Sequence, residues 1–227
     1  MAKVSKTAET KETKSTVIRE EIRISPPNFK RIKFTLEGTA PLLQHKFGGR
    51  KVQAMMDNMA AGSTTKKGKK RDPRDFEEDF KGAMHISSEG WCGVPAASFR
   101  NACIDVCRMA NFKMTHAKMS IFVEADGFDS VDGQPLVKLI AGKPEVTKMP
   151  VRNATGVADI RVRPMWRTWK INITVRFDAD QFTAEDVANL ISRAGEQCGI
   201  GEGRPYSKIS NGMGYGTFRI ANSDEIS

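Results

Sequence analysis

One short run constrains the fold of this chain more than any other stretch. From Trp169 to Phe177, large apolar side chains occupy every second position, and the positions between them carry polar or basic side chains such as Lys170 and Arg176. Successive residues of a β-strand point to opposite faces of a sheet, so this alternation predicts a strand with one buried and one polar face. Such a sheet must bury its apolar face against helices or against a second sheet.

The same alternation recurs in other segments, which we predict to be strands: residues 31–38, 119–124, 136–140, 159–163 and 217–221. Apolar residues at helical spacing predict helices over residues 51–61, 75–84, 96–110 and 183–194. The last helix opens with Thr183 and Asp186 in a capping-box pattern, and Gly195 suits its C-terminal cap. Residues 143–156 show little periodicity and are predicted to be irregular.

The chain order of these elements predicts an α+β fold. A strand, helices, two strands, an irregular segment, a long strand, a helix, a glycine-rich segment and a last strand fit a ferredoxin-like, split βαβ arrangement. This is an antiparallel sheet with helices on one face, here with a C-terminal glycine-rich loop. We assign residues 28–221 to this single domain, with flexible or polar tails at residues 1–27 and 222–227. A basic loop at residues 62–75 carries Lys69, Lys70 and Arg71.

The segment from Gly195 to Phe218 contains more glycine than ordinary core packing requires. Two sets of glycines enclose Arg204 and Lys208: Gly199, Gly201 and Gly203, then Gly212, Gly214 and Gly216. Glycine permits positive φ angles and close backbone contact, and exposed amides beside cations suit a phosphate group. A turn packed against the sheet would also explain the glycines, and Glu202 would repel an anion. The segment lacks the Gly-Lys-Ser/Thr sequence of a nucleotide-hydrolysing loop and does not follow a strand.

A second group of candidate binding residues is basic: Arg152, Arg161, Arg163, Arg167 and Lys170. Alternation places Arg161 and Arg163 on one face of a strand, where they could contact successive phosphates or instead pair with carboxylates. The loop with Lys69, Lys70 and Arg71 could contact phosphates or remain solvated. Three aromatic residues could stack on bases or pack internally: Phe122, Trp166 and Tyr206.

The overall charge favours an acidic partner. The formal net charge is +9, which favours nucleic acid over a membrane, although lysine-rich tails could serve solubility alone. No segment has the apolar length of a membrane helix, and the charged N-terminus does not resemble a signal peptide, so we expect a cytoplasmic protein. The four cysteines match no zinc spacing and are expected to be reduced. We expect no metal and no cofactor.

His45 is the candidate for chemistry. It could take a proton from a 2′-hydroxyl group while Lys46 or Arg50 stabilised the developing charge. A lone histidine without an identified partner more often has a structural role.

The close of the domain, with a helix, a glycine-rich loop carrying Arg204 and Lys208, and a final strand, resembles the RAMP superfamily of CRISPR RNA-binding proteins. The resemblance covers residues 31–221 by element order and residues 199–218 by motif. Residues 199–205 and 159–169 are also similar to a family encoded by tailed bacteriophages and prophages. The RAMP resemblance implies either a subunit that coats RNA or an endoribonuclease, and such nucleases often use a histidine after the first strand, where His45 lies.

These observations lead to one main prediction and two alternatives. The main prediction is a non-enzymatic phage protein of the bacterial cytoplasm that binds single-stranded RNA or DNA without regard to sequence. It would contact the phosphates through the glycine-rich loop and a basic sheet face, and could assemble along the strand as a homo-oligomer or filament. The first alternative is a metal-independent RAMP-type endoribonuclease that uses His45. The second is a virion or assembly component whose tails contact other proteins.

Overall fold

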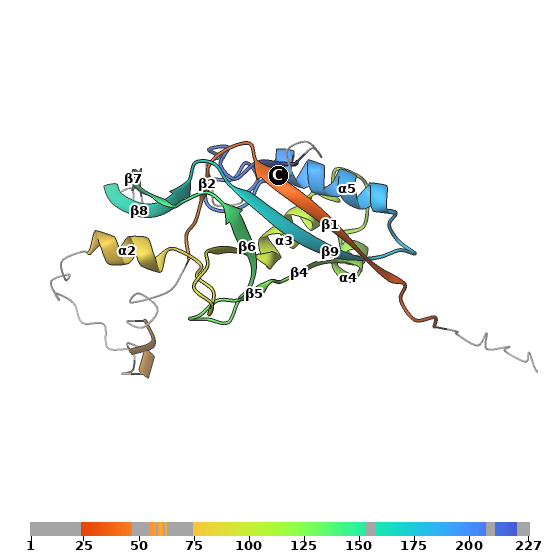
Figure 1. Ribbon diagram of the computed structural model, residues 1–227, viewed down its shortest axis with the longest axis horizontal. Coiled ribbons are helices and arrows are strands. Elements are labelled where there is room, and N and C mark those ends of the chain that lie inside the picture. Colours follow the sequence, from red (N-terminus) through yellow and green to blue (C-terminus); the bar gives the residue numbers. More distant parts are fainter. Residues whose placement is uncertain are drawn as a thin grey trace, which may run out of the picture.

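The computed structural model describes residues 24–46, 55–57, 59–60, 62, 75–152, 158–207 and 212–221. Over these residues the protein is α+β, with two antiparallel sheets and several short helices (Figure 1). None of the helices in this described part is long and apolar enough to cross a membrane.

The main sheet is built around strand β9, Lys170–Asp178. One edge of β9 pairs along its whole length with β1, Phe29–Gly38. The other edge is shared, because β6, Pro135–Ala141, pairs with the start of β9 and β4, Ile121–Glu124, pairs with its end. The strand predicted at residues 169–177 is therefore confirmed, and it lies at the centre of the sheet.

Three short strands complete this sheet. β10, Phe218–Ile220, flanks β1, and β3, Gly93–Pro95, flanks β6. β5, Gly127–Phe128, also pairs with β6. The path from edge to edge runs β10-β1-β9-β6-β3, so the first and last of the described strands lie side by side.

A second, three-stranded sheet projects beside the first. Its order is β2-β8-β7, with β2 at Leu42–Leu43, β8 at Ala158–Trp166 and β7 at Glu145–Arg152. Helix α2, Phe76–Gly82, lies near β8 on the same side of the molecule (Figure 1). β2 follows β1 after a short bend, so the second sheet begins where β1 ends.

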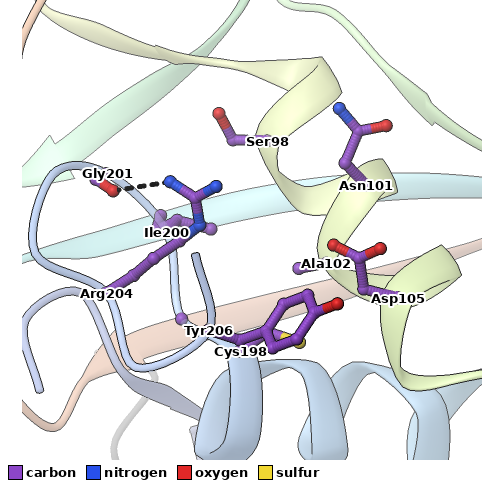
Figure 2. A pocket seen from close by; sticks show the side chains of 10 residues that line it. Ser98, Asn101, Ala102, Asp105, Cys198, Ile200, Gly201, Arg204 and Tyr206 are labelled. Atoms are coloured by element: carbon purple, nitrogen blue, oxygen red, sulfur yellow. Dashed lines mark hydrogen bonds between the residues drawn. The ribbon is translucent and has the colours of Figure 1, made fainter. Parts of the chain in front are cut away.

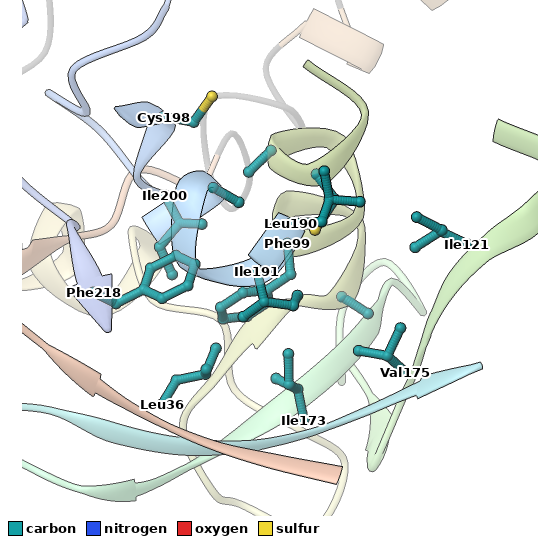
Figure 3. Close-up of a cluster of buried hydrophobic side chains, with 14 of the residues drawn as sticks. Leu36, Phe99, Ile121, Ile173, Val175, Leu190, Ile191, Cys198, Ile200 and Phe218 are labelled. Carbon is teal, nitrogen blue, oxygen red and sulfur yellow. The ribbon is translucent and has the colours of Figure 1, made fainter. Parts of the chain in front are cut away.

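Helices cover one face of the main sheet. They are α3, Ala96–Val106, α4, Met114–Ser120, and α5, Ala184–Arg193, which continues as a π-helical turn, Ala194–Cys198. Figure 3 shows side chains of α3 and α5 above those of the strands, in one apolar cluster.

The side chains at the centre of this cluster are fully buried. Leu36 and Phe99 are 0 % exposed, and Ile173 is 1 % exposed. Burial of a side chain of this size contributes about 1.5–3 kcal/mol, so the cluster fixes which face of the sheet remains polar.

Two predicted boundaries and one predicted irregular segment in the first two thirds of the chain are wrong. The strand predicted to start at residue 119 starts at Ile121, because Met119 belongs to α4 and is 66 % exposed. The segment predicted to be irregular contains β7, and the helix predicted to reach residue 110 ends at Val106.

The end of α5 also differs from the prediction. The Thr183 capping box is confirmed, but Gly195 lies inside the π-helical turn, and Gly199, with φ 65°, is the C-terminal cap. Gly195 is required for another reason, because a Cβ atom there would lie 2.1 Å from the carbonyl oxygen of Phe218 in β10.

Several predictions fall on residues outside the described set. Of the helix predicted at residues 51–61, only residues 55–57 and 59–60 are described, and these are helical. Residues 1–23, 63–74 and 222–227, which include most of the predicted tails and of the basic loop, lie outside the description.

Candidate nucleic-acid interface

The glycine-rich loop packs tightly on the segment that follows β1. A Cβ atom at Gly201 would lie 2.5 Å from the carbonyl oxygen of Leu43, and one at Gly216 would lie 1.8 Å from that of Ile200. The amide of Glu202 donates to the Leu43 oxygen at 2.9 Å, and the amide of Ile200 donates to the Gly216 oxygen at 2.9 Å. These two glycines are thus explained by close packing within the protein.

The rest of the loop divides into a packed and an open part. A Cβ atom at Gly203 would lie 2.8 Å from the ring of Tyr215, whereas one at Gly214 would meet nothing within 4 Å. Gly212 is similarly open, with its nearest such contact at 3.4 Å, and both Gly212 and Gly214 have positive φ angles. The open part of the loop therefore uses glycine for its backbone conformation alone, whereas the packed part, whose glycines also have positive φ angles, uses it for conformation and for space.

Glu202 joins the loop to the second sheet. Arg163 Nε donates to Glu202 Oε2 at 2.5 Å, and Arg161 Nη1 lies 3.7 Å from Glu202 Oε1. His45 Nδ1 lies 3.9 Å from Glu202 Oε2. Two arginines and a histidine thus surround one carboxylate, so the site keeps a positive charge even when His45 is neutral.

The three basic side chains differ in exposure. Arg163 is 4 % exposed and also donates to the carbonyl oxygen of Val162 at 3.0 Å, so its guanidinium is a buried anchor for Glu202. Arg161 and His45 are 34 % and 39 % exposed and can reach a ligand. The prediction that Arg161 and Arg163 share one face of a strand is confirmed, and the carboxylate that they share was not foreseen.

Strand pairing brings His45 to this place. Leu42 and Leu43 pair with Trp166 and Met165 of β8, so the chain beyond β2 runs alongside the arginine-bearing strand. The amide of the next residue, Gln44, donates to the carbonyl oxygen of Pro164 at 3.1 Å and continues this pairing.

Other predicted binding residues have different neighbours. Arg167 is 68 % exposed and pairs with Glu145 at 2.8 Å. Lys170 lies on the polar face of the main sheet, with its Nζ atom 3.6 Å from Glu37. Arg152 ends β7, but its side chain is outside the description, as are four predicted residues: Lys69, Lys70, Arg71 and Lys208.

Arg204 borders a small pocket between α3 and the loop (Figure 2). The pocket has a volume of about 110 Å³, and α3 contributes Ser98, Asn101 and Asp105 to its wall. Arg204 Nη1 donates to the carbonyl oxygen of Gly201 at 3.0 Å and so stabilises the loop itself. The pocket is below the range of about 300–1,000 Å³ that is usual for small-molecule sites.

A thiol lies at the floor of this pocket. Burial, together with the charge of Asp105, raises the pKa of Cys198 to about 11, so the thiol is protonated at neutral pH. Cys92, Cys103, Cys107 and Cys198 are all free thiols.

The three aromatic candidates for base stacking differ in exposure. Trp166 is 1 % exposed, so the hypothesis that it stacks on bases is wrong. Tyr206 is 41 % exposed at the pocket, and Phe122 is half-buried on the polar face of the main sheet. Phe29, at the start of β1, lies on that same face and was not predicted to stack on bases. The alternation of β1 extends back to Phe29 and places it on the polar face.

Lys46 does not assist His45. Its side chain is 5 % exposed and forms an ion pair with Asp129, whose side chain is 0 % exposed. His85 Nδ1 lies 3.3 Å from the other oxygen of Asp129. Burial lowers the pKa of His85, an effect opposed by Asp129.

The carboxyl of Asp129 remains ionised. Burial alone would raise its pKa, but hydrogen bonds from Lys46 and from the amide of Val131 outweigh this effect and leave the pKa below its usual value. This buried cluster joins the segment after β2, the segment before β3 and the segment after β5 through charge, and periodicity gave no sign of it.

No model of a known protein family matches the chain, and a search among curated proteins finds no match. Among the described residues, no group of three or more His, Cys, Asp or Glu side chains could hold a metal ion. The residues around Glu202 therefore form the candidate site.

Proposed function

We propose that this protein binds single-stranded nucleic acid, without regard to sequence, through its glycine-rich loop and the exposed arginine of β8, Arg161. The convergence of Arg161, Arg163 and His45 on Glu202 of the loop carries the proposal. Two groups of residues that the sequence singled out separately, the loop and the β8 arginines, meet at this point. Such a cluster of cations beside an open backbone suits phosphate groups.

The members of the cluster have different roles in this proposal. Arg163 is buried and orients Glu202, so it positions the loop and does not itself meet the ligand. Arg161 and the open part of the loop, around Gly214, contact the phosphates. Glu202 sets the strength of the site, since its carboxylate partly neutralises the two arginines.

We also propose that the main sheet is a ferredoxin-like core of the RAMP kind. The order β10-β1-β9, with β4 on the far edge of β9, supports it. β1, α3 and β4 then form one strand-helix-strand half, and β9, α5 and β10 form the other. An origin in a tailed phage, action in the bacterial cytoplasm and assembly of several copies along one strand belong to the same proposal.

Binding of labelled single strands at two salt concentrations tests the function. Oligouridine and oligothymidine of about 20 nucleotides should bind, and the affinity should fall steeply between 50 mM and 200 mM salt. Arg161→Ala should lower the slope of log affinity against log salt by about 0.7 for each phosphate that the side chain neutralises. Arg193→Ala, on the exposed side of α5, is the matched control and should leave the slope unchanged. Absence of salt-sensitive binding to either strand would refute the proposal.

One observation favours a second candidate, metal-independent RNA cleavage. His45 is 39 % exposed, and both His45 and Arg161 lie within 4 Å of the Glu202 carboxylate, so a general base lies close to a cation. In this reaction His45 takes the proton of a 2′-hydroxyl, the 2′-oxygen attacks the adjacent phosphorus, and the 5′-oxygen leaves and takes a proton from water. Cleavage of RNA in EDTA that disappears in His45→Ala would support this candidate, and cleavage that persists in the variant would exclude His45.

A further inference from the structure

Two phenylalanine rings and one arginine form a cluster on the polar face of the main sheet. Phe29 of β1 and Phe122 of β4 lie on the two strands that flank the end of β9, with ring centroids 5.8 Å apart in an edge-to-face arrangement. The guanidinium carbon of Arg176 in β9 lies 4.7 Å from the centroid of Phe29 and 4.8 Å from that of Phe122. We refer to Phe29, Phe122 and Arg176 as the Phe-Arg platform.

The platform is accessible and lies outside the apolar core. Phe29 is 36 % exposed, and Phe122 is half-buried. Neighbouring residues Ile121 and Val123 of β4 face the opposite way, toward the helices. The two rings are therefore not needed to cover the core.

The charges around the platform favour an anionic partner. Arg31 stands directly opposite Arg176 in the β1–β9 ladder, and like charges placed opposite each other destabilise a sheet. Glu124 pairs with Arg31 at 2.7 Å, and a third arginine, Arg100, lies 5.1 Å from the centroid of Phe122. Three guanidinium groups thus surround the rings, offset by Glu124 and by Asp178 opposite Phe29.

We propose that the Phe-Arg platform stacks unpaired bases of a single nucleic-acid strand. The inference rests on the proposed function and adds a base-contacting surface to its phosphate-contacting one. Aromatic rings and planar guanidinium groups both stack on bases, and the surrounding arginines attract the phosphates between them. The centre of a protein-protein interface is instead depleted of charged groups.

The platform is distinct from the glycine-rich loop. It lies at the start of β1, whereas the loop packs on the segment just beyond the end of β1. β1 has 10 residues, so at about 3.4 Å per residue the two surfaces are separated by about 30 Å along the sheet. In Figure 1 the start of β1 lies away from β7 and β8. A nucleic-acid strand that contacts both surfaces must therefore run along the main sheet.

Substitution of Phe29 tests the proposal, because this residue is half-exposed at a strand end. Phe29→Ala should weaken binding of oligouridine or oligothymidine by about 5- to 150-fold, the usual effect of removing the ring on which one base stacks. Phe29→Trp should restore the affinity. The same Phe29→Ala variant should bind an abasic strand of equal length as tightly as the unaltered protein does, since that strand has phosphates but no bases. Phe128→Ala removes a 58 % exposed ring elsewhere on the surface and is the matched control.

The outcomes separate this inference from the proposed function. If the unaltered protein binds oligouridine and oligothymidine and Phe29→Ala binds them equally well, the stacking platform is refuted and the phosphate site stands. If the unaltered protein binds no strand, both proposals fall. If Phe29→Ala weakens the abasic strand as well, the ring acts through the fold and stacking is refuted.

A second measurement does not depend on a folded variant. Oligonucleotides that carry 5-iodouracil form photochemical cross-links to aromatic side chains that stack on them. Cross-links of the unaltered protein should map to peptides that contain Phe29 or Phe122. Cross-links confined to other peptides would overturn the inference, and comparison of oligouridine with oligothymidine shows whether RNA or DNA is preferred.

Discussion

Two glycines of the loop, Gly214 and Gly216, allow a sharp test of which part of it supports the fold. Both have positive φ angles, 78° and 67°, and they are separated by a single residue. Alanine at either position carries the cost of a left-handed backbone, about 1–2 kcal/mol. At Gly214 this is the whole cost, because a Cβ atom there meets nothing within 4 Å.

The second substitution has a further cost. A Cβ atom at Gly216 would lie 1.8 Å from the carbonyl oxygen of Ile200, in the turn that carries the loop. Relief of that overlap must disturb the hydrogen bond from Ile200 to Gly216 and the 2.8 Å bond from the Gly216 amide to the oxygen of Pro41. With an overpacking cost added, Gly216→Ala should lose about 2–5 kcal/mol of the free energy of unfolding.

Thermal unfolding followed by circular dichroism measures the difference. For a chain of 227 residues, 1 kcal/mol corresponds to about 2–4 °C, so Gly214→Ala should melt about 2–8 °C lower and Gly216→Ala about 4–20 °C lower. Gly214→Ala should reduce nucleic-acid affinity although it remains folded, since it alters the open part of the loop. Equal losses of stability in the two variants would refute the division of the loop into a packed and an open part.

Three further predictions follow from interactions outside these glycines. Glu202→Gln should increase the affinity for single strands and steepen the slope of log affinity against log salt by about 0.7. It should also lower the free energy of unfolding by about 2–4 kcal/mol, because buried Arg163 loses its carboxylate partner. Unchanged affinity in the binding assay would contradict the role of this residue. Thr183→Ala should remove the cap of α5 and reduce the free energy of unfolding by about 0.5–2 kcal/mol in urea titrations, with binding unaffected. Burial holds the pKa of His85 below its usual value, so the unfolded chain binds more protons than the folded one, and the free energy of unfolding should fall as the pH drops through about 6.5. The dependence of the free energy of unfolding on pH should be weaker in His85→Gln, although loss of the interaction with Asp129 lowers stability at every pH.

The sequence predicted best those elements whose local pattern matches their burial. Ile171 and Ile173 of β9 face the core on a strict alternation, and Thr183 forms the capping box that its spacing to Asp186 indicates. β7 was missed because its apolar residues lie on both faces, with Val146 57 % exposed, and because Pro150 interrupts it. Proline is tolerated there since β7 is the edge strand of its sheet.

The site was predicted in its parts but not in its assembly. Alternation correctly placed Arg161 and Arg163 on one face, yet local patterns contain no information on which carboxylate they would meet. Glu202 is 39 residues beyond Arg163 in the chain and faces it only because the loop packs on Leu43. For the same reason Lys46, adjacent to His45 in sequence, points instead to the buried Asp129.

The contact at Glu202 also determines when the site can exist. It connects three segments that lie far apart along the chain, and contacts between distant segments form late because closing long loops costs entropy. During synthesis, His45 and Arg161 emerge well before the loop that brings them together. A nascent chain therefore lacks the assembled site until the loop around Glu202 has left the ribosome, and a chain that is still too short to include this loop should not capture a nucleic-acid strand through it.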